Sequence, residues 1–345
     1  MAEKPRIAIF DTLHPRESSF MRPLAAHLED AWQVDYYHPG SADELAGAAT
    51  EADVLWFEWC LQQPCYATNQ LDFRDKKVII RLHLFEAMDT NYPAMINWDN
   101  VDHLILVCED MREIMRIRFP QLPSKLDIRV IYNAIECNRY ASTAPKKMTD
   151  IAWVARIIMK KNPGMFLQIM AKLVAIDPAY RLHIAGVGRD LLLQRYIDSL
   201  IGKLGLGQHI VFYDFVEDMP TWLQDKGVLL STALYESFGM SIGEAMAAGA
   251  FPVIHNFPGA DQLWPRECLY STVDEAVELI RLAAPGKYVD FVRERYDAPI
   301  QFAATDALLA APNCKKGTQQ RELEIPQSRT QLRMRKRTKR RDNDG

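Results

Sequence analysis

The chain runs twice through the same alternation of short apolar segments and longer amphipathic ones, and this rhythm limits the folds open to it. In the first half, residues 19–30 place Phe20, Leu24 and Leu28 on one helical face between two apolar segments of strand length. The strands expected in this half are 6–10, 52–59, 77–83, 103–108 and 128–133. Strands that alternate with helices form a parallel sheet covered on both faces. The pattern therefore predicts an α/β protein with a doubly wound sheet at its N-terminal end.

A polar segment of small residues, 141–150, interrupts the alternation and has little to bury, as expected of a linker between domains. After it the same rhythm resumes, and the expected strands are 150–156, 180–186, 209–214, 227–233 and 251–256. The predicted parts are an N-terminal domain at 1–142, a C-terminal domain at 149–285, closing helices at 286–311 that return to the first domain, and a tail at 312–345. Doubly wound sheets bind ligands beyond the carboxyl ends of their strands, so two such domains facing each other predict a ligand cleft between them.

The composition is that of an ordinary globular protein, with 345 residues, 48% of them hydrophobic and 25% charged. The sequence has no signal-peptide core and no uncharged segment long enough to span a bilayer, so we expect a cytoplasmic protein. Six cysteines are scattered without metal-ligand spacing, which favours reduced, partly buried thiols over metal or disulfide roles.

The C-terminal tail differs from the rest in charge. Residues 315–345 carry a net charge of +7, and taking this from the total of −4 leaves −11 for the remaining chain. With almost no large apolar residues, the segment 312–345 is expected to be disordered. Its cations would bind phosphates, but it has no aromatic residues for stacking on bases, so no specific nucleic acid is expected. A solvated tail, or one drawn to an anionic membrane surface, are the other interpretations.

The strongest motif is the segment 235–254, in which Glu236 precedes a predicted helix and Glu244 lies eight residues later, inside it. The amides at the start of this helix belong to Phe238, Gly239 and Met240, and partial positive charge there favours anions. A carboxylate such as Glu244 can accept two hydrogen bonds, as from the two hydroxyls of a ribose.

This segment resembles the Glu-x7-Glu signature of the family 4 retaining glycosyltransferases. The resemblance implies the two-domain GT-B fold, two Rossmann-like domains facing across a cleft, and an enzyme that moves a sugar from a nucleotide-diphosphate donor, linked to UDP or GDP, to an acceptor hydroxyl. It also implies that Glu244 holds the nucleotide ribose, and that Glu236 with the following amides holds the donor sugar. The acceptor would be a glycan or a lipid-linked carbohydrate, and no cofactor is expected.

A second element is the basic turn after the strand at 150–156. Arg156 ends this strand and Lys161 follows five residues later, just before a helix that Pro163 can open. Two fixed cations there can neutralise a departing diphosphate without a metal, and the resemblance implies this role for them. Lys160 is an adjacent alternative, although we expect it to point to solvent, and a merely solvated basic turn is the competing interpretation.

Weaker signals complete the resemblance, which covers about residues 1–310. His83 ends a strand, where an imidazole can hydrogen-bond the donor sugar. Val216 and Glu217 resemble contacts to the nucleotide base. The family commonly has two glycines in the first strand-to-helix loop, but Ser18 and Ser19 stand there in this chain.

The candidate catalytic residues are His83, Arg156, Lys161 and Glu236; the candidate donor contacts are Ser18, Ser19, Val216, Glu217, Phe238, Gly239, Met240 and Glu244. No metal ligand is expected, because the one Asp-x-Asp pattern, at 342–344, lies in the tail. The missing glycines leave open a catalytically weak protein of this fold that acts as a scaffold or binding partner. The basic tail leaves open a nucleic-acid-associated protein that acts through its cations.

Overall fold

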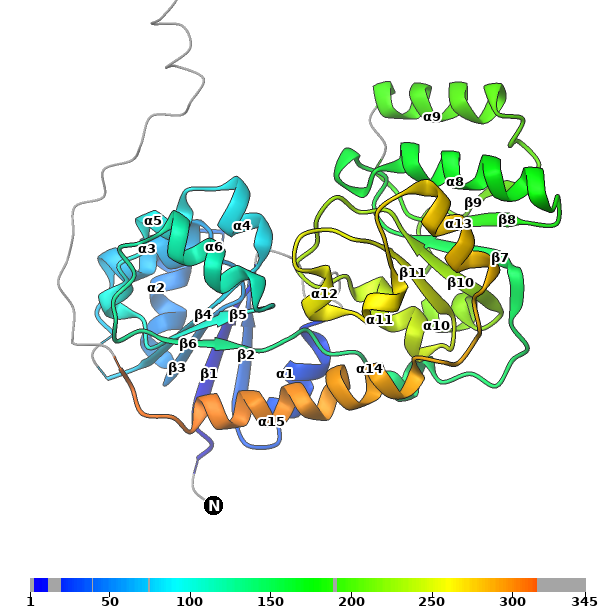
Figure 1. Ribbon diagram of the computed structural model, residues 1–345. Coiled ribbons are helices and arrows are strands. Elements are labelled where there is room, and N and C mark those ends of the chain that lie inside the picture. The colour runs from blue at the N-terminus through cyan, green and yellow to red at the C-terminus, as the bar shows by residue number, and fades with distance from the viewer. Residues whose placement is uncertain (1–2, 12–19, 39, 74, 189–190, 315–345) are drawn as a thin grey trace, which may run out of the picture.

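The protein folds into two parallel α/β domains, each built on one sheet (Figure 1). The computed structural model describes residues 3–11, 20–38, 40–73, 75–188 and 191–314. Each of the two sheets has six strands within these residues, and every strand pair in them is parallel. The predicted fold class, two doubly wound domains of α/β type, is confirmed.

The N-terminal sheet has the order β2-β1-β3-β4-β5-β6. Its strands are β1 (Arg6–Phe10), β2 (Gln33–Tyr37), β3 (Val54–Phe57), β4 (Lys77–Leu82), β5 (His103–Leu106) and β6 (Asp127–Val130). Its helices are α1 (Arg22–Leu28), α2 (Ala42–Glu51), α3 (Gln62–Gln70), α4 (Leu84–Asp89), α5 (Tyr92–Met95) and α6 (Asp110–Arg118). The central strands are buried on both faces because helices cover both sides of the sheet.

The C-terminal sheet has the order β12-β11-β10-β7-β8-β9. Its strands are β7 (Lys147–Val154), β8 (Arg181–Ala185), β9 (Ile210–Phe212), β10 (Lys226–Ser231), β11 (Phe251–His255) and β12 (Leu269–Tyr270). The accompanying helices are α7 (Cys137–Tyr140), the 3-10 helix η2 (Met159–Lys161), α8 (Pro163–Ile176), α9 (Leu191–Lys203), α10 (Met219–Leu223), α11 (Met240–Ala247), α12 (Ala260–Leu263) and α13 (Val273–Arg281). In this order β7 and β10 are neighbours, and the loops that follow them meet where Thr232 bonds to Lys161, which lies 71 residues earlier in the chain.

Two further helices, α14 (Val289–Tyr296) and α15 (Ala298–Leu309), run from the C-terminal domain back along the N-terminal one (Figure 1). Helix α15 packs on α1, where the His27 ring stacks on Phe302 with centroids 4.4 Å apart and its Nε2 lies 3.0 Å from Asp306 Oδ2. The Lys77 ammonium donates to the carbonyl of Leu309 at 2.5 Å. The C-terminal end of α15 is therefore hydrogen-bonded to β4 of the N-terminal sheet.

An aromatic cluster joins the two domains beneath the segment that carries the Glu-x7-Glu pattern. The ring centroid of Tyr296 lies 4.9 Å from that of Phe238, 5.4 Å from that of Trp264 and 5.2 Å from that of Tyr132. Phe238 is buried, so its position is fixed by contacts from both domains. The loop between β10 and α11 is therefore held at the domain junction. None of the described helices combines the length and the apolar character needed to cross a bilayer.

Candidate active site

The first part of the site is the turn between β7 and α8, which holds Lys161 at the carboxyl end of the sheet. Asn162 adopts the left-handed conformation (φ 48°), and Pro163 then begins α8. The loop after β10 fixes this turn: the Thr232 hydroxyl donates to the carbonyl of Lys161 at 2.6 Å, and the Leu234 amide donates to that of Lys160 at 2.8 Å. Hydrogen bonds to the backbone of Lys160 and Lys161 therefore fix the position of Lys161.

Lys161 and Glu236 form an ion pair directly above the junction of β7 and β10. The Nζ atom of Lys161 contacts Oε1 of Glu236, and their side chains are only 18% and 12% exposed. A cavity of about 10 Å³ lies between the strand ends and this pair, enough for about one water molecule. Two residues that the sequence analysis assigned to separate motifs therefore meet at one point.

Lys160 does not point to solvent as predicted. Its ammonium lies over the ring of Tyr235, 4.6 Å from the centroid, and burial lowers its pKa, while the nearby Glu236 carboxylate opposes that shift. The prediction failed because Tyr235 comes from a loop that only the folded sheet brings beside this turn. The hydroxyl of Tyr235 in turn donates to Asp89 at 3.2 Å, which links the turn to the N-terminal domain.

Arg156 is exposed beside the turn that follows β8. A Cβ atom at Gly186 would lie 1.7 Å from the carbonyl oxygen of Ala155, so only glycine lets these two strand ends approach. A Cβ atom at Gly188 would lie 3.8 Å from Nε of Arg156. The charge of Arg156 also acts on Lys160, where it helps to lower the pKa of that lysine. Two lysines therefore lie near the Glu236 carboxylate, and Arg156 is close enough to act on one of them.

Helix α11 begins at the same loop. Gly239 precedes it with φ 88°, a conformation that glycine adopts without strain. The first-turn amides of a helix have no partners within the helix, so those that begin α11 are available to an anion. Gly243 packs against the domain junction, since a Cβ atom there would lie 2.7 Å from Cγ1 of Ile135. Of the predicted residues Phe238, Gly239 and Met240, Gly239 lies beside Glu236, since a Cβ atom there would be 3.9 Å from Cγ of Glu236.

Glu244 faces α7 at the junction of the domains. Burial raises the pKa of its carboxyl group, while a hydrogen bond from the Tyr140 hydroxyl and the charge of Arg139 oppose that shift. Helix α7 packs against both α11, which carries Glu244, and α10, which follows the loop with Val216 and Glu217. Val216 is half-buried and Glu217 is exposed in that loop. The sequence analysis missed Tyr140, which ends α7 just before the linker predicted at 141–150.

His83 lies at the end of β4, buried against a polar network of the N-terminal domain. Its Nε2 is 3.1 Å from Oε1 of Glu58, which also accepts from Arg81 at 3.2 Å. The ring of Trp59 stacks on the imidazole with centroids 4.2 Å apart. Glu58 and Trp59 therefore fix the orientation of His83; neither was predicted, and the only signal is their position at the end of the strand run at 52–59.

The backbone next to His83 touches the opposite domain. The amide of Leu84 donates to the hydroxyl of Ser237 at 3.1 Å, across 153 residues of sequence. His83 and Glu236 thus belong to neighbouring segments on the two sides of the junction. The predicted contacts Ser18 and Ser19 lie outside the described residues, as does the tail from residue 315 onward. Within the part that is described, no three His, Cys, Asp or Glu side chains group as metal ligands would.

Sequence relatives of the chain are glycosyltransferases. Residues 135–264 match the family described as glycosyl transferases group 1. The putative glycosyltransferase EpsD of Bacillus subtilis is 30% identical over 98 residues, 28% of this chain and 25% of that protein. A GDP-Man:Man(3)GlcNAc(2)-PP-Dol alpha-1,2-mannosyltransferase of Dictyostelium discoideum is 26% identical over 171 residues, 44% of this chain and 34% of that protein. The matched segments thus span a quarter to a third of these relatives.

The fold has solved counterparts. HepE of Anabaena, crystallised with UDP and glucose, superposes with a TM-score of 0.67 at 17% identity, covering 89% of this chain and all of that one. The segment that matches the group 1 family, residues 135–264, contains the basic turn, the Lys161–Glu236 pair and Glu244. These findings agree with the predicted enzyme class for the segment that they cover: residues 135–264 are similar to group 1 glycosyltransferases and lie within a two-domain fold of the GT-B type.

Proposed function

We propose that the protein is a metal-independent, retaining glycosyltransferase that takes its sugar from a nucleoside-diphosphate donor held by the C-terminal domain. The observation that carries this proposal is the Lys161–Glu236 pair at the carboxyl ends of β7 and β10, beside the first turn of α11. Carboxylate, cation and free helix amides are the groups that a sugar diphosphate requires at one place.

The proposed reaction replaces one C1–O bond of the donor sugar by another. The donor diphosphate lies between Arg156, Lys161 and the amides at the start of α11, and Glu236 exchanges its lysine partner for sugar hydroxyls. As the bond from C1 to the phosphate oxygen lengthens, negative charge grows on the leaving diphosphate and the fixed cations stabilise it. The acceptor oxygen attacks C1 from the same face, and its proton passes to the departing phosphate.

The other residues have positioning roles in this proposal. Glu244 binds the ribose, and the loop with Val216 and Glu217 lies near the base. His83, held by Glu58, lies on the N-terminal side and hydrogen-bonds the donor sugar. HepE was crystallised with UDP and the Dictyostelium relative is named for a GDP-linked sugar, so both UDP and GDP donors belong in the first assays. The proposed acceptor is a carbohydrate or a lipid-linked saccharide, and the tail at 312–345 is proposed to contact anionic lipid.

A panel of UDP- and GDP-sugars, screened by thermal shift and by donor hydrolysis, tests the proposal. We expect one class of nucleotide sugar to raise the melting temperature and to be hydrolysed slowly without an acceptor. A protein that responds to none of the panel would not be a transferase of this kind.

Excess chelator is expected to leave hydrolysis or transfer intact, because Arg156 and Lys161 take the place of a metal at the diphosphate. The measurement compares initial rates with and without EDTA. Activity that stops with EDTA and returns with added Mg²⁺ or Mn²⁺ would show that a metal is required.

Nucleotide affinity is expected to fall as the pH falls through the raised pKa of Glu244, because only the ionised carboxylate accepts both ribose hydrogen bonds. The hydrogen bond from Tyr140 favours that ionised form, so Tyr140→Phe should raise the pKa of Glu244 further and move the loss of affinity to higher pH. Calorimetric titrations of UDP or GDP from about pH 8 to about pH 5 measure the shift. Tyr180→Phe, a half-buried tyrosine at the start of β8, serves as the control. Superimposable pH profiles for the parent and Tyr140→Phe would remove Tyr140 from this role.

A further inference from the structure

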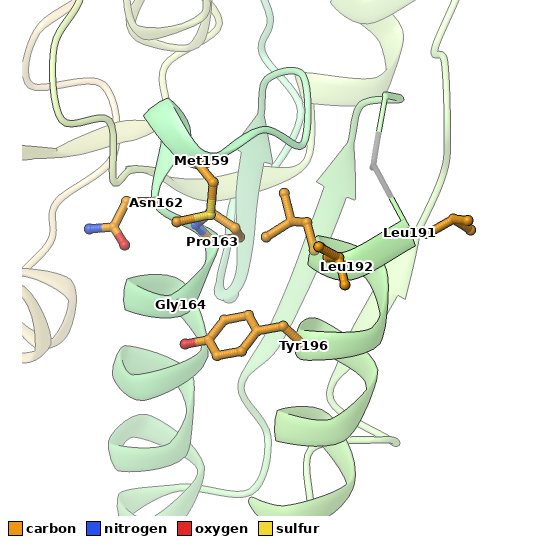
Figure 2. Close-up of a pocket in the computed structure, with 8 residues that line it drawn as sticks. Met159, Asn162, Pro163, Gly164, Leu191, Leu192 and Tyr196 are labelled. Atoms are coloured by element: carbon orange, nitrogen blue, oxygen red, sulfur yellow. The ribbon is translucent and has the colours of Figure 1, made fainter. Parts of the chain in front are cut away.

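An apolar groove lies where the N-terminal ends of α8 and α9 meet, next to the basic turn. Its volume is about 660 Å³. Figure 2 shows the side chains that line it, with Tyr196 extending from α9 toward α8 and Leu191 turned outward. The lining residues are Met159, Asn162, Pro163, Gly164, Leu191, Leu192, Leu193 and Tyr196.

The side chains at the edge of this groove are far more exposed than apolar residues of a helix usually are. Leu191 is 89% exposed, Leu192 is 81% exposed and Met159 is 65% exposed. Helix α9 already buries Leu193 and Ile197 against the domain, so Leu191 and Leu192 form a second apolar surface on its first turn. Single exposed apolar residues are common. A contiguous group of them on one edge indicates a surface that contacts another molecule or a membrane.

Further exposed apolar side chains lie on segments linked by hydrogen bonds to the basic turn, one of them in the other domain. Leu234, 46% exposed, is hydrogen-bonded through its amide to Lys160, the neighbour of Met159. The next residue, Tyr235, bonds to Asp89 at the end of α4, and that helix exposes Phe85 and Met88. We call this set the apolar rim; it comprises Phe85, Met88, Met159, Leu191, Leu192, Tyr196 and Leu234.

Cations accompany the apolar rim. Arg156 and Arg195 are exposed, and the Lys160 ammonium lies over the ring of Tyr235. Two carboxylates also lie nearby: Asp198 accepts a hydrogen bond from Gln194 and Asp89 accepts one from Tyr235, and both donors are neutral. Protruding leucine and methionine side chains with arginines beside them match the boundary between acyl chains and anionic headgroups.

We propose that the apolar rim docks the protein on a phospholipid bilayer that contains anionic lipid. Leu191, Leu192 and Met159 enter the interface, and Arg195, exposed on α9 beside them, contacts headgroup phosphates. Docking in this orientation turns the basic turn and the domain junction toward the membrane surface. The proposal concerns the surface alone and does not depend on the transfer reaction.

Vesicle flotation of the full chain tests this docking. The parent is expected to bind vesicles of phosphatidylcholine with phosphatidylglycerol more strongly than phosphatidylcholine alone. Leu191→Ser with Leu192→Ser should weaken the partition coefficient about tenfold or more, since two large apolar side chains no longer enter the interface. Leu282→Ser is the matched control, because Leu282 is 70% exposed at the end of α13, outside the apolar rim, and should partition like the parent.

The basic tail requires a separate arm of the same experiment. About 0.5 M salt screens the attraction between tail cations and lipid, whereas the apolar contribution persists. Binding by the apolar rim therefore survives in salt and stays sensitive to the double substitution. Two results would overturn the proposal: a double variant that floats like the parent, or parent binding that salt abolishes completely. Equal melting temperatures for parent and variants establish that folding is unchanged.

Discussion

Lys161→Ala is expected to lower turnover about a hundredfold or more, while donor affinity falls less. The lysine is proposed to act mainly on charge that grows as the diphosphate departs, so its loss is felt in the transition state more than in the bound donor. Removing one preorganised electrostatic group typically costs about 3 kcal/mol there. Steady-state kinetics on the donor found by screening, with direct titration of the same donor, separates the two effects.

Three companion variants make this test specific. Lys161→Arg should recover part of the lost turnover, because a cation again faces Glu236. Lys172→Ala, at an exposed surface pair with Asp274, should behave like the parent. Lys160→Ala should lose less than Lys161→Ala, because Lys160 lies on Tyr235 while Lys161 contacts the carboxylate. If Lys160→Ala were the inactive variant and Lys161→Ala active, the leaving-group role would belong to Lys160.

Glu244→Ala is expected to weaken donor binding by about 1.5–3 kcal/mol, or about 10- to 150-fold, since a charged acceptor of two hydrogen bonds is lost. Folding should change little, because burial already opposes ionisation of this carboxyl group. Calorimetry with the nucleotide and a melting curve measure both quantities. Glu278→Ala, at an exposed pair with Arg281, is the control. Unchanged affinity in a folded Glu244→Ala protein would remove Glu244 from the site.

The sequence predicted the two sheets because buried parallel strands read as continuous apolar segments, as in β3, β4 and β10. Two of the four edge strands escaped prediction. Gln33–Tyr37 forms β2, but no residue of this strand is fully buried, so its sequence lacks the apolar signal. The other missed strand, β12, has only two residues.

Within the site, the sequence predicted which residues take part but not which of them contact each other. Lys161 and Glu236 were assigned to different motifs, and their contact depends on β7 and β10 being neighbours, which the strand order alone decides. The burial of Lys160 depends on the same arrangement through Tyr235. The network of Glu58 and Arg81 behind His83 is equally a product of tertiary packing, since each residue alone looks like a charge on a strand.

Calorimetric titration of UDP and GDP into the full chain tests the central claim most directly, that the C-terminal domain holds a nucleotide-diphosphate sugar. We predict that one of the two nucleotides binds at a single site, and that Glu244→Ala weakens this binding at least about tenfold while Glu278→Ala leaves it unchanged. Two results would contradict a donor site around Lys161, Glu236 and Glu244. The first is that neither UDP, GDP nor their nucleotide sugars bind the folded parent protein. The second is that the nucleotide binds the parent and the Glu244→Ala variant with equal affinity.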